Sequence, residues 1–112
     1  MKRTFLGEFE EVVLLVIAGC SEEAYGVTIW ERLQQQTGRA ITMSAVHATL
    51  YRLEEKGYLA SELGGATAER GGRRKRFFAI TATGSKALLE IQEMRANLWQ
   101  EIPAGKLQVI IK

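Results

Sequence analysis

Apolar residues along the chain recur first with helical spacing, then with strand spacing, and finally with helical spacing again. This pattern predicts three helices, a two-stranded hairpin and a last helix, with short polar or glycine-containing segments between them. The predicted elements are helices at residues 7–18, 25–36 and 44–56, strands at 58–63 and 73–80, and a last helix that runs to about residue 101. In the first strand Leu59 and Leu63 are expected to point inward, and in the return strand Phe78 and Ile80 share a face.

Residues that start and stop helices support these bounds. Thr42 or Ser44 can cap the third helix, because a hydroxyl oxygen accepts a hydrogen bond from a free amide of the first turn. Thr81 or Thr83 can cap the last helix in the same way, and Pro103 stops it.

Three helices followed by a hairpin indicate a winged helix-turn-helix. The second helix of such a motif lies in the major groove of DNA, where the base edges can be distinguished. Here it would be the third helix, whose apolar face carries Val46, Leu50 and Leu53 and whose other face is polar. We therefore expect a mainly α fold with a small β-hairpin. Residues 1–81 would form the winged helix-turn-helix DNA-binding domain, and residues 82–112 a C-terminal dimerisation helix with a short tail.

The polar face of the third helix carries the candidate DNA contacts. His47 could bond a base edge, Tyr51 a phosphate, and Arg52 a phosphate or guanine. Alternatively, Tyr51 packs under the hairpin and Arg52 pairs with Glu55, while Lys56 complements the helix dipole. The candidates in and before this helix are Thr42, Ser44, His47, Ala48, Tyr51 and Arg52.

The hairpin tip combines glycines with five basic residues between Arg70 and Arg76. Glycine lets the backbone approach a phosphate closely, and cations displace the counterions condensed on DNA. A solvated charged hairpin is the alternative, but the position directly after a helix-turn-helix favours DNA binding. The candidate wing contacts are Gly72, Arg73, Arg74 and Lys75.

An apolar stripe with heptad-like spacing runs along the last helix, and Trp99 adds apolar area beside it. One winged-helix unit cannot bury all of this surface, whereas a homodimer can, and two-fold symmetry suits a palindromic duplex operator. Docking of the last helix on its own domain is the alternative. Trp99 is also a candidate ligand contact, although a tryptophan in such a stripe is more often packing. The dimerisation candidates are Leu6, Phe9, Val13, Leu88, Ile91, Met94, Leu98 and Ile102.

The composition argues against several other classes of protein. The net charge is only +2, so the clustering of basic residues indicates DNA binding rather than their number. Cys20 and His47 are the single cysteine and histidine, which excludes an intrachain disulfide and a Cys/His zinc site within one chain. With no glycine-rich phosphate loop either, we expect no cofactor and no enzyme activity. Cys20 is expected to be a small buried residue.

The N-terminal segment has some features of a lipoprotein signal. Lys2 and Arg3 precede an apolar run at 12–18, and Cys20 follows it. However, three glutamates lie where such a signal is neutral or basic, and the apolar residues recur with helical spacing. No segment is long enough to span a membrane, so we expect a cytoplasmic protein.

Several segments, taken together and in this order, resemble the PadR family of transcriptional regulators over residues 5 to about 95. These segments are 6–10, 24–29, 50–57, 70–78 and 80–84. The resemblance implies a winged-helix dimer, usually a repressor that leaves its operator when an inducer such as a small aromatic compound binds. It also implies dimerisation through the last helix. The DNA contacts that it implies are Ser44, His47, Tyr51 and Arg52 in the helix and Gly72, Arg73 and Lys75 in the wing.

The sequence departs from the family pattern at three places. His47 stands where the family often has tyrosine, and Phe77 and Phe78 stand where tyrosines are common. The chain ends soon after Pro103, which argues against a large inducer pocket. Two rival hypotheses remain: a winged-helix module that binds protein partners, and a constitutive repressor without an inducer.

Overall fold

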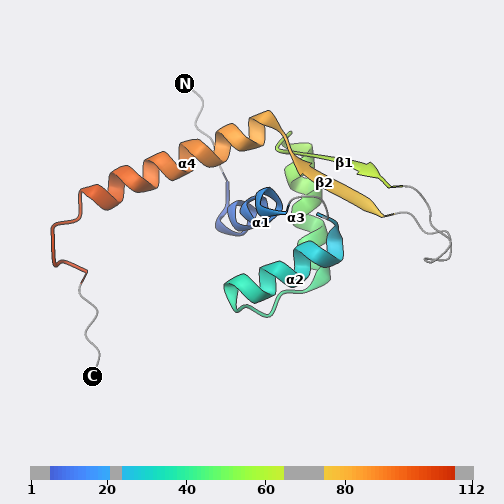
Figure 1. The fold of residues 1–112 in the computed structure, drawn as a ribbon, viewed down its shortest axis with the longest axis horizontal. Helices are drawn as coiled ribbons and strands as arrows, with labels where there is room; N and C mark the ends of the chain where they lie inside the picture. Colours follow the sequence, from blue (N-terminus) through green and yellow to red (C-terminus); the bar gives the residue numbers. More distant parts are fainter. Residues whose placement is uncertain (1–5, 21–23, 65–74, 108–112) are drawn as a thin grey trace.

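The computed structural model of the chain describes residues 6–20, 24–64 and 75–107. In this part, helices and strands follow the predicted order, and the fold is mainly α with one small hairpin. Three helices and the hairpin form one body, which the last helix leaves as a long arm (Figure 1). The elements are α1 (Glu8–Gly19), α2 (Gly26–Thr37), α3 (Met43–Glu55), β1 (Leu59–Leu63), β2 (Arg76–Ile80) and α4 (Ala82–Gln100).

The helix ends follow from the local chemistry of the sequence. Thr42 Oγ1 accepts a hydrogen bond from the Ala45 amide at 3.1 Å, so Thr42 caps α3. Thr81 Oγ1 accepts from the Gly84 amide at 3.0 Å and caps α4. In each case the first of the two alternatives from the sequence is the cap. Gly38 ends α2 with φ 68°, a left-handed conformation that glycine adopts without steric cost.

The core lies between α1, α2 and α3, and the hairpin closes one side of it. Burial of one large apolar side chain, such as a leucine or isoleucine, stabilises a fold by about 1.5–3 kcal/mol relative to leaving that side chain exposed. Cys20, predicted to be buried, is half-buried and packs against this core. The largest fully buried side chains are Leu14, Ile29, Leu33, Leu50, Leu53, Val13, Val46 and Thr49.

The hairpin lies against the helices at one end and extends past them at the other (Figure 1). At the near end Leu59 lies opposite Ile80, and at the far end Leu63 lies opposite Arg76. Phe78 and Ile80 share a face, as predicted, and this face packs against the core. The prediction that Leu63 points inward is wrong, because its side chain lies beyond the helices and is 50% exposed.

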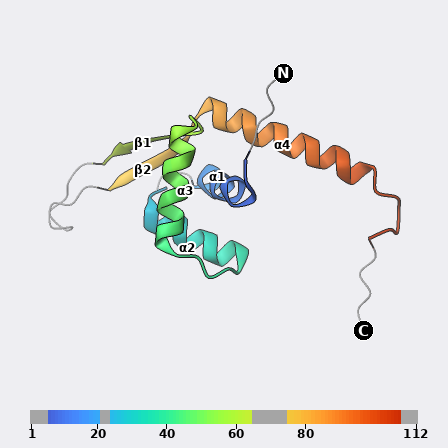
Figure 2. The same cartoon turned by 180° about the vertical axis from the view of Figure 1, so that it is seen from behind.

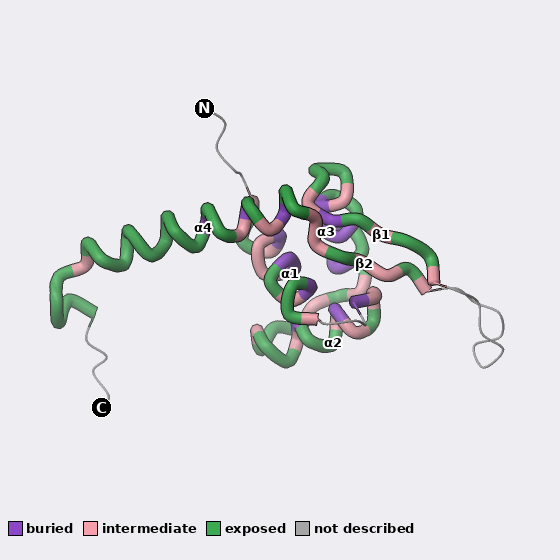
Figure 3. The backbone as a smooth tube through the Cα atoms, turned by 45° about the horizontal axis from the view of Figure 1, so that its top comes forward, coloured by how far each residue is buried: buried purple, intermediate pink, exposed green. Residues whose placement is uncertain are grey.

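The surroundings of α4 change along its length. Ala87 and Ile91 are buried and Leu88 packs against the core, whereas every residue from 92 to 100 is exposed (Figure 3). The first half of α4 therefore docks on its own domain. This corrects the prediction that Ile91 faces a second copy, whereas Leu88 is half-buried and stays a predicted dimer contact. Val13, another predicted dimer contact, is fully buried in the core and offers no surface to a partner.

Candidate nucleic-acid interface

The face of α3 opposite the core is largely exposed to solvent. Val46, Leu50 and Leu53 are buried as predicted, and Figure 2 shows α3 on the outside of the body with α1 behind it. The candidate contacts on this face are all exposed: Ser44, His47, Ala48, Tyr51 and Arg52. Tyr51 is 67% exposed, so it does not pack under the hairpin. The structure thus presents these side chains together, and their contacts with DNA stay a prediction.

A groove lies beside His47, between the first turns of α2 and α3 and the strand β2. It is lined by Tyr25, Gly26, Val27, Met43, His47, Lys75, Arg76 and Phe78. Gly26 allows the close approach of the two helices, because a Cβ at this position would lie 3.2 Å from Cε1 of His47. The groove brings the imidazole of α3 and the cations at the base of the wing to one surface.

An aromatic pair builds one wall of this groove. The rings of Tyr25 and Phe77 meet edge to face with centroids 5.7 Å apart. Lys75 Nζ lies 3.6 Å from the centroid of the Tyr25 ring, which is a cation–π contact. The contact holds one wing cation beside the start of α2. Phenylalanine at 77 therefore packs as a ring here, and no hydroxyl is needed for that role.

Tyr25 and Gly26 were not among the candidate site residues from the sequence. Their signal was present, since both fall in the segment 24–29 that resembles the family, but no periodicity places that segment beside β2. The structure does so through a backbone hydrogen bond: the Phe78 N–H donates to the Ala24 carbonyl at 2.8 Å. A long-range backbone contact of this kind has no local signature.

The tip of the wing, with the predicted contacts Gly72, Arg73 and Arg74, lies outside the described residues. Its base is tied to α3 by a short polar chain. Arg76 Nη1 donates to Ser61 Oγ at 2.9 Å, and Ser61 in turn donates to Glu54 Oε2 at 2.6 Å. The strand that leads to the wing is thereby fixed relative to the last turn of α3.

The cations at the C-terminal end of α3 are bound to Glu10 of α1. Lys56 Nζ donates to both carboxylate oxygens at 2.9 Å, and Arg52 Nε lies 3.6 Å from Oε2. The alternative that Arg52 pairs with Glu55 is therefore wrong, because the carboxylate that packing brings to it is that of Glu10. Lys56 is the C-terminal cap residue of α3, where its charge can complement the helix dipole, and its side chain also bonds Glu10.

Opposing effects act on the Glu10 carboxyl. Burial raises its pKa, whereas hydrogen bonds from Lys56 and from the Gly7 amide lower it. The positive charges of Lys56 and Arg52 lower it further, so that the pKa of Glu10 lies below its usual value. This carboxyl is therefore an anion at neutral pH.

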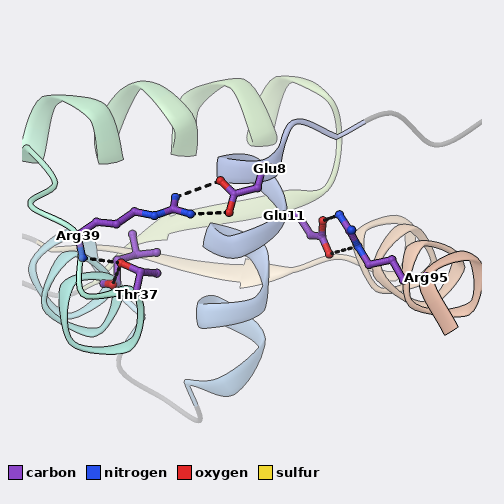
Figure 4. Close-up of polar contacts among 6 residues, drawn as sticks. Glu8, Glu11, Thr37, Arg39 and Arg95 are labelled. Atoms are coloured by element: carbon purple, nitrogen blue, oxygen red, sulfur yellow. Dashed lines mark hydrogen bonds and ion pairs between the residues drawn. The ribbon is translucent and has the colours of Figure 1, made fainter. Parts of the chain in front are cut away.

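Two neighbouring glutamates bind other parts of the chain (Figure 4). Glu8 forms a bidentate ion pair with Arg39, with N–O distances of 3.0 and 2.7 Å. The hydrogen bond from Arg39 lowers the pKa of Glu8. Glu11 accepts from Arg95 of α4 at 2.7 Å, which raises the pKa of Arg95. The acidic first turn of α1 thus contacts three separate segments.

The outer half of α4 carries an exposed apolar surface. Met94, Leu98 and Trp99 are 50%, 56% and 65% exposed, and Ile102 is half-buried. Nearer the body, an apolar groove between α1 and α4 is lined in part by Leu15, Ala18, Ile80, Leu88 and Leu89. Trp99 lies further along α4 than this groove.

In residues 6–20, 24–64 and 75–107, no three His, Cys, Asp or Glu side chains are grouped so that they could hold a metal ion. Among the same residues, no helix has the length and apolar character needed to cross a bilayer.

Three helices with a hairpin beside an exposed third helix define a winged-helix protein. Its sequence matches the transcriptional regulator PadR-like family over residues 13–90, and the chain belongs to this family. Members of the family are transcription regulators and not enzymes, so the chain is a DNA-binding transcription regulator. No curated protein matches the chain.

Solved structures share the fold. A PadR-like transcription factor from Bacteroides fragilis superposes with a TM-score of 0.70 at 18% identity, covering 82% of this chain and 84% of that one. A PadR family regulator from Eggerthella lenta gives 0.64 at 25% identity, covering 83% and 80%. One from Clostridium difficile gives 0.64 at 17% identity, covering 85% and 93%. The chain therefore spans most of the length of each.

Proposed function

We propose that the chain is a sequence-specific repressor that binds a palindromic duplex operator as a homodimer. The observation that carries the proposal is the exposed face of α3, which carries His47, Tyr51 and Arg52 and whose His47 lines one groove with the cation Lys75. Short and hydrogen-bonding side chains on one helix face suit the major groove, and a cation at the wing suits the phosphate backbone. Because the target is chromosomal DNA, we also place its action in the cytoplasm.

The proposed dimer forms through residues 82–112, while residues 1–81 bind DNA. Support comes from Met94, Leu98 and Trp99, three large apolar side chains that are at least half exposed on the outer half of α4. Contiguous exposed apolar surface of this kind marks an interaction site. A two-fold dimer places two copies of α3 on successive turns of one DNA face, which is the geometry that a palindrome matches.

The proposed inducer is a small aromatic molecule. The apolar groove between α1 and α4, lined by Leu15, Leu88 and Leu89, offers a surface of suitable chemistry. Trp99 remains a second candidate contact, since its indole ring is exposed. A ligand bound at either place would contact α4, and a shift of α4 would change the spacing of the two DNA-binding domains in the proposed dimer.

Selection of bound duplexes from a random DNA pool tests this function. The selected duplex is then titrated by fluorescence anisotropy at two salt concentrations, beside a random duplex. We expect an enriched palindrome that binds about 10³-fold or more tightly than random DNA. Weak, sequence-independent binding would instead favour a module for protein partners. A specific complex that no aromatic compound releases would favour a constitutive repressor.

A further inference from the structure

A buried carboxylate reaches the DNA-binding helix from another element. Glu10 belongs to the first turn of α1 and is only 7% exposed. Its oxygens accept hydrogen bonds from the Gly7 amide at 2.9 Å and from Lys56 Nζ, also at 2.9 Å, and lie 3.6 Å from Arg52 Nε. One anion thus faces two cations at the end of α3.

These two cations lie on the side of α3 that continues the candidate DNA-binding face. Arg52 and Lys56 are one helical turn apart, and their side chains are 53% and 39% exposed. Arg52 Nη2 also donates to the buried Thr49 Oγ1 at 3.2 Å. The guanidinium is therefore drawn back along its own helix and is still open to solvent on its other side.

A phosphate of DNA would compete with Glu10 for the same donors. The cluster of Glu10, Arg52 and Lys56 carries one negative and two positive charges, so it presents a net charge of +1. Without the carboxylate the same surface would present a net charge of +2, and the side chains of Arg52 and Lys56 would be free to contact any DNA phosphate within reach. Phosphate contacts carry no sequence information, so such freedom raises binding to all DNA.

We propose that Glu10 is a positioning residue for operator recognition: it restrains Arg52 and Lys56 and thereby limits their sequence-independent contacts with DNA. The inference rests on the proposed DNA-binding function and names one residue that tunes its specificity. On the operator, Arg52 makes its contact from the restrained position, so release adds little there. On random DNA, release adds a contact that the restrained side chain does not make.

Glu10→Gln is the first test, because glutamine keeps the shape and the acceptor for the Gly7 amide and removes the charge. Wild type and variant are titrated by anisotropy with operator and random duplexes over a range of salt. We expect the affinity for random DNA to rise and its slope of log affinity against log salt to steepen by about 0.9 per added phosphate contact. The ratio of operator to random affinity should fall.

Glu8→Gln is the matched control. It removes the same charge from the same turn of α1, but its partner Arg39 lies outside α3. Unchanged ratio and slope in this variant would show that the effect of Glu10→Gln is local. Equal changes in both variants would overturn the proposal, since they would indicate a general charge effect.

Glu10→Asp is the second variant and covers the case in which Glu10→Gln does not fold. Aspartate keeps the charge but is one carbon shorter, so the restraint weakens while the net charge stays. We expect a lower operator preference and a salt slope on random DNA between those of wild type and Glu10→Gln, because a weaker restraint frees the cations only in part. A purely structural role would lower the free energy of unfolding and leave preference and slope as in wild type, which would sink the inference. Failure of the wild type to prefer any duplex would instead sink the proposed function.

Discussion

Gly84 lies in the first turn of α4, where this turn passes against the segment between α3 and β1. A Cβ at this position would collide with the carbonyl of Tyr58 and with the side chain of Ile80. The carbonyl is also used, since it accepts a hydrogen bond from the Thr81 amide at 3.1 Å. The absence of a side chain at residue 84 is therefore what lets α4 start so close to the hairpin.

Gly84→Ala should destabilise the fold by about 1–3 kcal/mol, because backbone and core must move to admit the methyl group. Chemical denaturation measures the free energy of unfolding. Gly19→Ala is the matched control, since it is also a helical glycine and a Cβ there meets nothing within 4 Å. We expect the control to be neutral or more stable by at most about 1 kcal/mol. Equal stability of the two variants would contradict the close contact.

Glu10 should make stability depend on pH in the acid range. Its pKa in the folded protein lies below the usual value of 4.5, with Lys56 and Arg52 as the facing charges. A lowered folded-state pKa means that the contribution is fully present above the unfolded pKa and is lost as the pH falls through the folded one. The difference in unfolding free energy between wild type and Glu10→Gln should therefore shrink below about pH 4.5. A constant difference from pH 7 to pH 3 would refute this linkage.

At the scale of elements, local chemistry was enough to predict the helix ends and the two faces of α3, but not how the hairpin lies against the helices. Capping threonines and Gly38 mark the helix ends, and the spacing of Val46, Leu50 and Leu53 correctly separates the two faces of α3. The prediction for Leu63 failed because alternation in a strand shows which residues share a face but not how far the covering core extends. The wall of Tyr25 and Phe77 was missed because it depends on pairing of β2 with a distant segment.

Lys75→Ala tests the wing at its described base. If Lys75 neutralises a phosphate, the variant should weaken binding to operator and random DNA alike and flatten the salt slope by about 0.9. Anisotropy titrations over a range of salt give both quantities. Lys86→Ala, at an exposed position on α4, removes the same charge away from the wing and should leave the slope unchanged. An unchanged slope for Lys75→Ala would mean that this cation serves only to cover the Tyr25 ring.

At the scale of the whole molecule, α1 links α3 to the arm formed by α4. Its ion pairs join residues that are 31, 46 and 84 positions apart in the chain, through Glu8, Glu10 and Glu11 respectively. Sequence patterning could not predict these partners, because periodicity reports which face is buried and not which distant element lies against it. The same limit explains the apolar stripe of α4, which is divided between its own core and solvent at about Ile91.

That exposed half of the stripe leads to a prediction about assembly. Leu98→Asp places a charge among the large apolar side chains of the arm. The Leu98 side chain is 56% exposed in the single chain and is buried in the proposed dimer. Burying an unpaired charge is costly, so the variant should be a monomer in sedimentation equilibrium at concentrations where wild type is a dimer. Its affinity for the full palindrome should fall toward that for a half-site, because each monomer then binds alone.

Gln100→Asp is the matched control: it adds the same charge at an exposed polar position of α4 and should remain dimeric. A dimeric Leu98→Asp variant with undiminished palindrome affinity would show that the outer half of α4 is not the interface.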